Sequence, residues 1–253
     1  MKDGQSERKP RGKSVPPHVL KKAQELKTKS GIPMGAAIEV ALGVKTLTQV
    51  LTALKLQEEV AALVAAGKLN RSIGGSVVAG SLSLAKALEE SRVGARKREK
   101  DYKHCHLDDY AASGDAATLA LVGHRLVTGT VEASTPFEVV IRPDKEEPLT
   151  LHKHDVKLYF LAKDKKVVVK TLEWGDQSRT LAPDHLKDRN NRKDVKARTY
   201  QHAMDGGRSV TWTTAEGEQV RGKVAWYGRY EVVLSLAKGP NVVMMRHAVD
   251  TVE

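Results

Sequence analysis

Short β-type runs separated by tight-turn residues fill the C-terminal stretch Ser209–Val252. The turns fall at Glu216-Gly217, at Gly228-Arg229 and across residues 238–241. Evenly spaced short strands of this kind predict a small all-β barrel. Gly222 lies inside a strand pattern, where a missing side chain lets a strand bend sharply enough to close such a barrel.

A second copy of this pattern lies 93 residues earlier in the chain. Subtracting 93 places Gly222 on Gly129, and the aligned runs follow without a gap. Tyr230-Glu231-Val232-Val233 aligns with Phe137-Glu138-Val139-Val140, and Arg246-His247 aligns with Lys153-His154. Self-similarity in one register marks a duplicated unit. The sequence therefore predicts two related barrels.

The N-terminal third has a helical pattern and a repeat of its own, with an offset of 37 residues. Each repeat predicts three short helices, the second of which ends at Gly43 or Gly80, where glycine suits a left-handed C-terminal position. Thr46 and Ser83 are good N-caps for the third helices. The third helix of the first repeat is expected to run into the first helix of the second repeat.

These patterns predict an α+β protein, with an all-α repeat pair followed by two small β-barrels. The predicted parts are a disordered basic tail (1–18), two three-helix modules (19–55 and 56–91), a basic linker or helix extension (92–106), a first barrel with an extra hairpin (107–174), a polar linker (175–193) and a second barrel with a leading helix (194–253).

The order of pieces in each barrel resembles the Sm fold of the bacterial Hfq family of RNA chaperones. That family has a bend glycine, a third strand that begins with an aromatic residue, and a Lys-His pair before the last strand. Lys153-His154 keeps the pair, while Arg246-His247 replaces the lysine with an arginine, which has the same charge and a different geometry.

The resemblance implies a uridine pocket in each barrel. Phe137 with Lys153 and His154 would form one pocket, and Tyr230 with Arg246 and His247 the other. A base can stack on an aromatic ring while a nearby cation neutralises phosphate. In the alternative interpretation, the two aromatic residues belong to the barrel cores and the histidines are satisfied structural groups. The A-tract face of the family is poorly matched, because its first-strand aromatic falls at Thr213 and Ala120.

The charge balance fits a polyanionic partner. Lys and Arg outnumber Asp and Glu by 42 to 31, which gives a net charge of +11. Basic clusters outside the pockets are predicted as secondary phosphate contacts: Arg96, Lys97, Arg98, Arg189, Arg192 and Lys193. The basic tail either contacts phosphate or only solubilises the chain. We expect single-stranded RNA as the partner, in post-transcriptional regulation.

Other kinds of chemistry have weak support. His104-Cys105-His106 with Asp108 and Asp109 hints at a metal, but the spacing is too tight for ordinary structural zinc, so surface histidines and an inert thiol are the better interpretation. No nucleophile motif, phosphate loop or apolar carboxylate pair is present. We therefore expect no enzyme, metal or cofactor.

Two other functions stay open. Three helices per module invite a helix-turn-helix interpretation and thus a DNA-binding regulator, but the second helices lack the long polar side chains that read base edges. The helical modules suit protein docking better. A structural scaffold would use the Sm-like barrels for oligomerisation alone.

The resemblance also implies an assembly. Hfq-type barrels pair their edge strands into rings of six, so a chain with two barrels would complete the same ring as a homotrimer. The predicted hairpin Leu158–Trp174 would cover one such edge, which favours a monomer or dimer slightly over the trimer. The single cysteine, Cys105, and the absence of an apolar run of about 18 residues lead us to expect a soluble cytoplasmic protein with no membrane partner.

Overall fold

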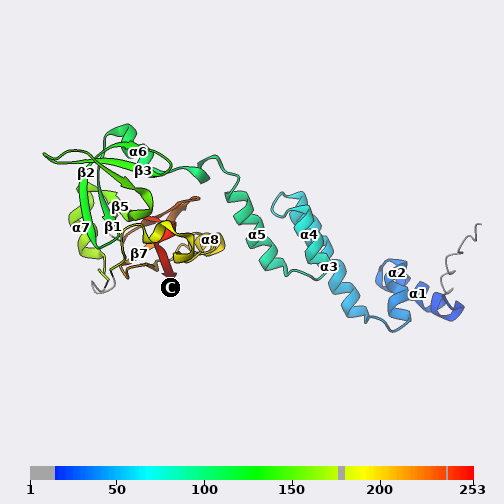
Figure 1. Cartoon of the computed structure of the whole chain (residues 1–253). Coiled ribbons are helices and arrows are strands. Elements are labelled where there is room, and N and C mark those ends of the chain that lie inside the picture. The colour runs from blue at the N-terminus through cyan, green and yellow to red at the C-terminus, as the bar shows by residue number, and fades with distance from the viewer. Residues whose placement is uncertain (1–14, 176–179, 238) are drawn as a thin grey trace, which may run out of the picture. The chain divides into compact units, whose positions relative to one another are not determined.

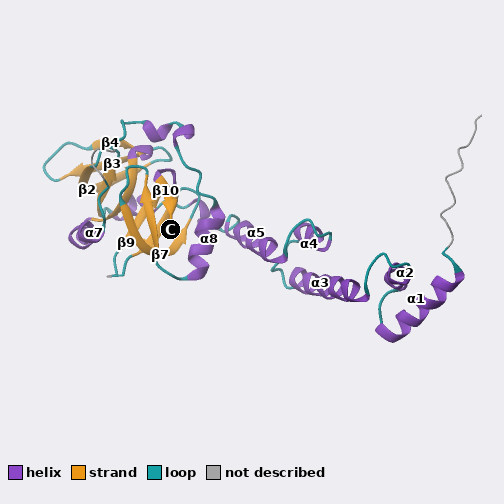
Figure 2. Cartoon of the chain, turned by 90° about the horizontal axis from the view of Figure 1, so that it is seen from below, coloured by secondary structure: helices purple, strands orange, loops and turns teal. Residues whose placement is uncertain are grey.

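The computed structural model describes residues 15–175, 180–237 and 239–253. It divides into two compact units, Met1–Leu88 and Glu89–Glu253 (Figure 1). The α+β class is confirmed, since helices and one antiparallel sheet make up the described chain (Figure 2). Most of the predicted basic tail lies outside the described residues. Across the described ranges, none of the helices combines the length and the apolarity that crossing a bilayer needs.

The first unit consists of helices whose ends follow local sequence signals. Thr46 caps its helix in a capping box with Gln49, and Gly43 and Gly80 have φ of 72° and 75°, a left-handed conformation that favours glycine. Residues from adjacent helices form two small apolar clusters, and the third helix contributes to both, with Val50 in one cluster and Val60 in the other. The helices are α1 (Pro17–Ser30), α2 (Met34–Ala41), α3 (Leu47–Ala65), α4 (Arg71–Val78) and α5 (Leu84–Arg96), whose second half belongs to the other unit.

The second unit has two halves with the same order of elements. The first half holds α6 (His106–Ser113), β1 (Ala116–Leu121), β2 (Arg125–Ser134), β3 (Glu138–Pro143), β4 (Leu149–His152), the 3₁₀ turn η2 (Lys153–Asp155) and β5 (Val156–Leu161). The second half holds α8 (Ala197–Gly206), β6 (Val210–Thr214), β7 (Gln219–Tyr227), β8 (Glu231–Ser235), β9 (Asn241–Met245), the 3₁₀ turn η6 (Arg246–Ala248) and β10 (Val249–Val252). Helix α6 packs on β2, and α8 packs on the matching strand β7.

All ten strands form one open sheet in the order β10-β6-β7-β8-β9-β5-β1-β2-β3-β4. The prediction of two separately closed barrels is therefore not met. Across the sheet, the fifth strand of each half lies beside its first strand, and the second, third and fourth strands follow in sequence order. The halves join where β5 of the first half pairs with β9 of the second half through Leu158↔Met244 and Tyr159↔Val243. This edge pairing joins the halves into a single compact unit.

The predicted bend at Gly129 has a steric cause. A Cβ atom at Gly129 would lie 2.2 Å from the carbonyl oxygen of Arg142 on the neighbouring strand, and a register shift follows between Val131 and Ala133. The second half has a matching shift between Val224 and Trp226. Glycine thus allows the close backbone approach in the bent part of the sheet.

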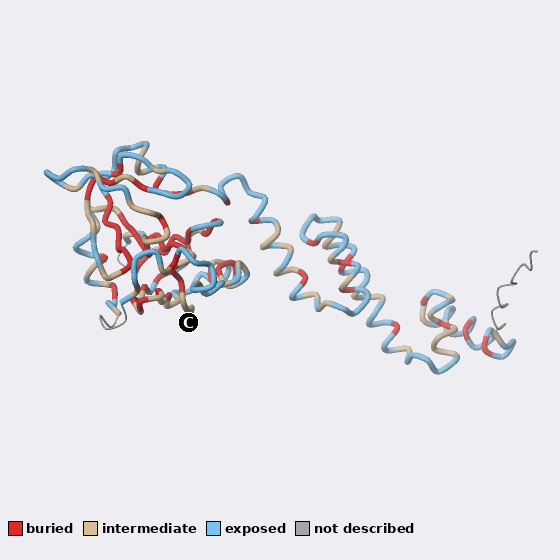
Figure 3. The backbone as a smooth tube through the Cα atoms, in the orientation of Figure 1, coloured by how far each residue is buried: buried red, intermediate tan, exposed pale blue. Residues whose placement is uncertain are grey.

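Buried residues concentrate in the strands of this unit (Figure 3). Its two core clusters each draw side chains from both halves. One adds Leu158 and Phe160 of β5 to residues of the second half, and the other adds Val233 and Val243 to residues of the first half. Within the segment predicted as a polar linker, 175–193, the described residues 180–193 pack on this core through the fully buried Leu186 and include the 3₁₀ turns η4 (His185–Lys187) and η5 (Arg189–Asn191).

The predicted β-hairpin after β5 is wrong. Val167–Val169 belongs to the helix α7 (Lys165–Thr171), which buries Val168 in the core, and Leu172 directly after the helix is buried in the same core. A short run of valines fits a buried helix as well as a strand, and tertiary packing decides between them. The edge of β5 pairs with β9 instead. The reason for favouring a monomer or dimer over a homotrimer is thereby removed.

Candidate nucleic-acid interface between the two halves

The two predicted aromatic residues lie on the surface. Phe137 and Tyr230 occupy the loops before β3 and β8, and 65% and 48% of their respective surfaces are exposed. Neither ring contributes to the core, so the alternative interpretation of the aromatics as core residues is wrong. Their exposure leaves both rings accessible to a ligand.

The same backbone bond ties each aromatic residue to its cationic partner. The amide N of Lys153 donates to the carbonyl oxygen of Phe137 at 2.7 Å, and the amide N of Arg246 donates to that of Tyr230 at 2.8 Å. Each cation begins the 3₁₀ turn that leads into the last strand of its half. The grouping of aromatic, cation and histidine predicted from the duplicated pattern is therefore present twice.

The two histidines meet where the halves join. The rings of His154 and His247 lie 5.2 Å apart between centroids, at an interplanar angle of 75°. His247 Nε2 lies 3.2 Å from the carbonyl oxygen of His154, a distance that assigns the proton to Nε2. The sequence predicted two separate pockets, whereas the structure brings their histidines into contact.

Two adjoining cavities lie around this histidine pair. The larger cavity, of about 400 Å³, is lined by Phe137 and Lys153, and the smaller one, of about 280 Å³, by Arg246. Both are lined by His154, Tyr230 and His247. All six predicted pocket residues therefore contribute to one continuous surface, which we call the junction site.

The two cations have different roles. Lys153 is buried, with Nζ 3.3 Å from Cys105 Sγ and 3.6 Å from an Asp108 carboxylate oxygen, and the residue lines the larger cavity. The guanidinium of Arg246 donates to the carbonyl oxygens of Gly228 and Arg229 at 2.8 and 3.2 Å. The several donors of arginine allow this double contact, so Arg246 holds the loop that carries Tyr230.

Burial sets the protonation of the histidines. It lowers the pKa of His247 to about 3. Burial and the nearby Arg192 guanidinium lower the pKa of His154. At neutral pH His247 is a neutral hydrogen-bonding group. The buried Nδ1 of His154 has no hydrogen-bond partner among the described residues.

Burial also affects the single cysteine. It raises the pKa of the Cys105 thiol to about 12, so the thiol stays protonated at neutral pH. The thiolate is the nucleophilic form of cysteine, and Cys105 therefore has no reactive character. This agrees with the interpretation of an inert thiol.

The predicted phosphate contacts divide into two groups. Arg189, Arg192 and Lys193 line the smaller cavity. Arg96 does not fit the prediction, because its buried guanidinium donates to the Tyr227 carbonyl and pairs with Asp101. Lys97 and Arg98 are exposed but line neither cavity of the junction site.

One functional candidate was missed in the sequence. Arg229 lines the smaller cavity, and its guanidinium carbon lies 5.2 Å from the centre of the Tyr230 ring. A cation beside an aromatic residue at a turn is a weak signal alone. It gains meaning only once the ring is known to be exposed.

No protein-family model, no curated protein and no solved structure matches this chain. The interpretation of the junction site therefore depends on its geometry and chemistry.

Proposed function

We propose that the second unit binds single-stranded RNA at the junction site, in the manner of a pair of Hfq-like Sm modules acting in post-transcriptional regulation. One observation carries the proposal. Each half contributes an exposed aromatic ring, a cation and a histidine, and these two sets adjoin on a single basic surface.

The chemistry of the surface suits nucleotides. A base stacked on an exposed ring such as Phe137 or Tyr230 gains about 1–3 kcal/mol without a requirement for one sequence. A neutral histidine can donate or accept a hydrogen bond at a base edge or at the 2′-hydroxyl that distinguishes RNA from DNA. Arg189, Lys193 and Arg229 supply positive charge for the phosphates.

The topology supports the Sm-like part of the proposal. In each half a helix precedes five antiparallel strands, the last strand pairs with the first, and a 3₁₀ turn joins the fourth strand to the fifth. Pairing of β5 with β9 resembles the edge-to-edge contact by which Sm-like modules assemble, here formed within one chain. The outermost strands are β4, the fourth strand of the first half, and β10, the fifth strand of the second half. They are the same two kinds of edge that pair at the junction of β9 with β5.

Titrations with three ligands separate this proposal from its alternatives. We expect U-rich single-stranded RNA to bind more tightly than A-rich RNA or duplex DNA in fluorescence anisotropy. Preferred binding of duplex DNA would favour a DNA-binding regulator, and no binding of any of the three would favour a scaffold.

Salt dependence tests the phosphate contacts. Arg189 and Lys193 are exposed, and their neutralisation in Arg189→Gln/Lys193→Gln should reduce the slope of log affinity against log salt by about 1.4, at about 0.7 per contact for a single strand. The matched control, Lys97→Gln/Arg98→Gln, neutralises two exposed cations outside both cavities and should leave the slope nearly unchanged. An equal reduction by the control would place the phosphate path on the basic segment instead.

A further inference from the structure

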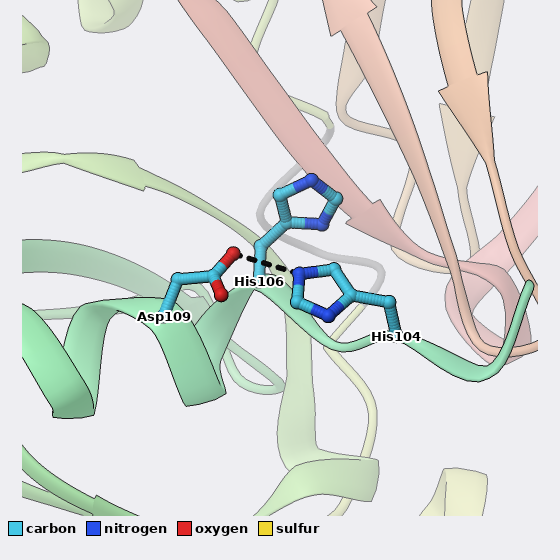
Figure 4. A group of neighbouring side chains, drawn as sticks. All are labelled: His104, His106 and Asp109. Carbon is cyan, nitrogen blue, oxygen red and sulfur yellow. Dashed lines mark hydrogen bonds and ion pairs between the residues drawn. The ribbon is translucent and has the colours of Figure 1, made fainter. Parts of the chain in front are cut away.

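We propose that His104, His106 and Asp109 bind one divalent transition-metal ion of the zinc class. Figure 4 shows the two imidazole rings and the Asp109 carboxylate grouped together at the start of α6. One ligand atom from each of the three side chains lies within 4.8 Å of the others. Two imidazoles and one carboxylate form a donor set that zinc prefers. This proposal is independent of RNA binding.

The local backbone explains the grouping. His106 is the first residue of α6 and Asp109 follows three positions later, so both side chains project from the same face of the helix. His104 precedes the helix in an extended conformation, and its Nε2 lies 2.7 Å from Asp109 Oδ2. In a tetrahedral site with bonds of about 2.1 Å, ligand atoms are about 3.4 Å apart. The pair therefore needs to separate by less than about 1 Å.

A buried carboxylate orients His106. The Nδ1 atom of His106 lies 3.1 Å from Glu231 Oε2, and the amide N of His106 donates to the same oxygen at 2.9 Å. Glu231 is fully buried and also accepts from Tyr159 OH at 2.7 Å. With the Nδ1 proton directed at Glu231, Nε2 is the His106 nitrogen that keeps a lone pair for a metal. A carboxylate behind a ligating histidine is the usual outer partner in zinc sites.

The three side chains are accessible to a metal ion from solvent. His106 is partly exposed, whereas His104 and Asp109 are more exposed. The His106 ring packs at 4.8 Å against Trp226, which walls one side. Three protein ligands leave a fourth tetrahedral position for water.

A second group of possible ligands shows why this one is favoured. His124, Glu216 and Glu218 also lie close together. There the Lys157 ammonium already contacts both carboxylates and neutralises them as a metal ion would. At His104, His106 and Asp109, no lysine or arginine contact with the three side chains is found within the described chain.

Isothermal titration of the full chain, without an affinity tag and after chelator treatment, tests the site with ZnCl₂. We expect one zinc per chain, and little binding of MgCl₂, which prefers oxygen ligands. His104→Ala and Asp109→Asn should each weaken zinc binding by at least about tenfold, and Glu231→Gln by about 10–100-fold. Cobalt substitution should give the visible absorption of a four-coordinate site.

The control His202→Ala removes an exposed histidine of α8 and should leave zinc binding unchanged. His104 and Asp109 are the exposed ligands, so their variants keep the test valid if Glu231→Gln fails to fold. Absence of zinc binding to the wild-type chain would overturn the proposal. So would an unchanged affinity and stoichiometry in His104→Ala/Asp109→Asn. Neither result depends on whether RNA binds.

Discussion

Removal of both exposed rings in Phe137→Ala/Tyr230→Ala should weaken binding of U-rich single-stranded RNA by about 2–6 kcal/mol, or roughly 30-fold to 10⁴-fold. The reason is that each ring offers a stacking platform worth about 1–3 kcal/mol per base. Because both residues are exposed and neither belongs to the core, the thermal midpoint of unfolding should change little. Anisotropy titrations and circular dichroism melts measure the two effects.

The conservative pair Phe137→Tyr/Tyr230→Phe is the matched control. It keeps both rings and exchanges only the hydroxyl group, so stacking should persist and the affinity should stay near that of the wild type. If the alanine variant folds and binds RNA as well as the wild type does, the rings are not the binding platform, and the basic segments would have to account for any affinity.

A buried ionic network that links the two halves leads to the second large effect. Lys157 of β5 contacts the carboxylates of Glu216 and Glu218 in the turn between β6 and β7, and all three side chains are fully buried. Glu216 also accepts from the amide N of Gly123 at 2.8 Å and from that of Leu181 at 2.7 Å. Burial would raise the pKa of Glu216, but the hydrogen bonds from Lys157, Leu181 and Gly123 outweigh it and lower the pKa.

Lys157→Met should therefore lower the free energy of unfolding by about 3–5 kcal/mol, because it leaves two carboxylates buried without their counter-ion. Urea denaturation measures this loss. Adding Glu216→Gln and Glu218→Gln should recover part of it, since these three positions then bury no charge. Lys166→Met, at an exposed position on α7, is the control and should change stability by less than about 0.5 kcal/mol. A similarly small effect of Lys157→Met would mean that the network does not hold the halves together.

Local signals made the helices of the first unit predictable. Thr46 and the glycines at 43 and 80 act within a few residues of their own positions, and the observed caps follow them. The open sheet and helix α7 depend on contacts distant in sequence, which local patterns do not contain. Val167–Val169 has strand propensity, yet the core accepts Val168 and Leu172 from a helix.

The sequence predicted which residues belong to the candidate site, but not that they form one site. The 93-residue offset aligned the aromatic, cationic and histidine positions of the two halves. Pairing of β5 with β9 then brings His154 against His247, and no motif in the sequence specifies that pairing. Arg96 shows the same limit, because its carbonyl partner on Tyr227 lies 131 residues away. Its charge alone indicated a phosphate contact.

Photo-crosslinking tests the proposed RNA site most directly. A U-rich oligonucleotide that contains 4-thiouridine would be irradiated with the full chain, and the crosslinked peptides mapped by mass spectrometry. Binding at the junction site predicts crosslinks in the loops that carry Phe137 and Tyr230, competed by unlabelled U-rich RNA. Crosslinks confined to residues 1–103, with none in either loop, would contradict the proposed site.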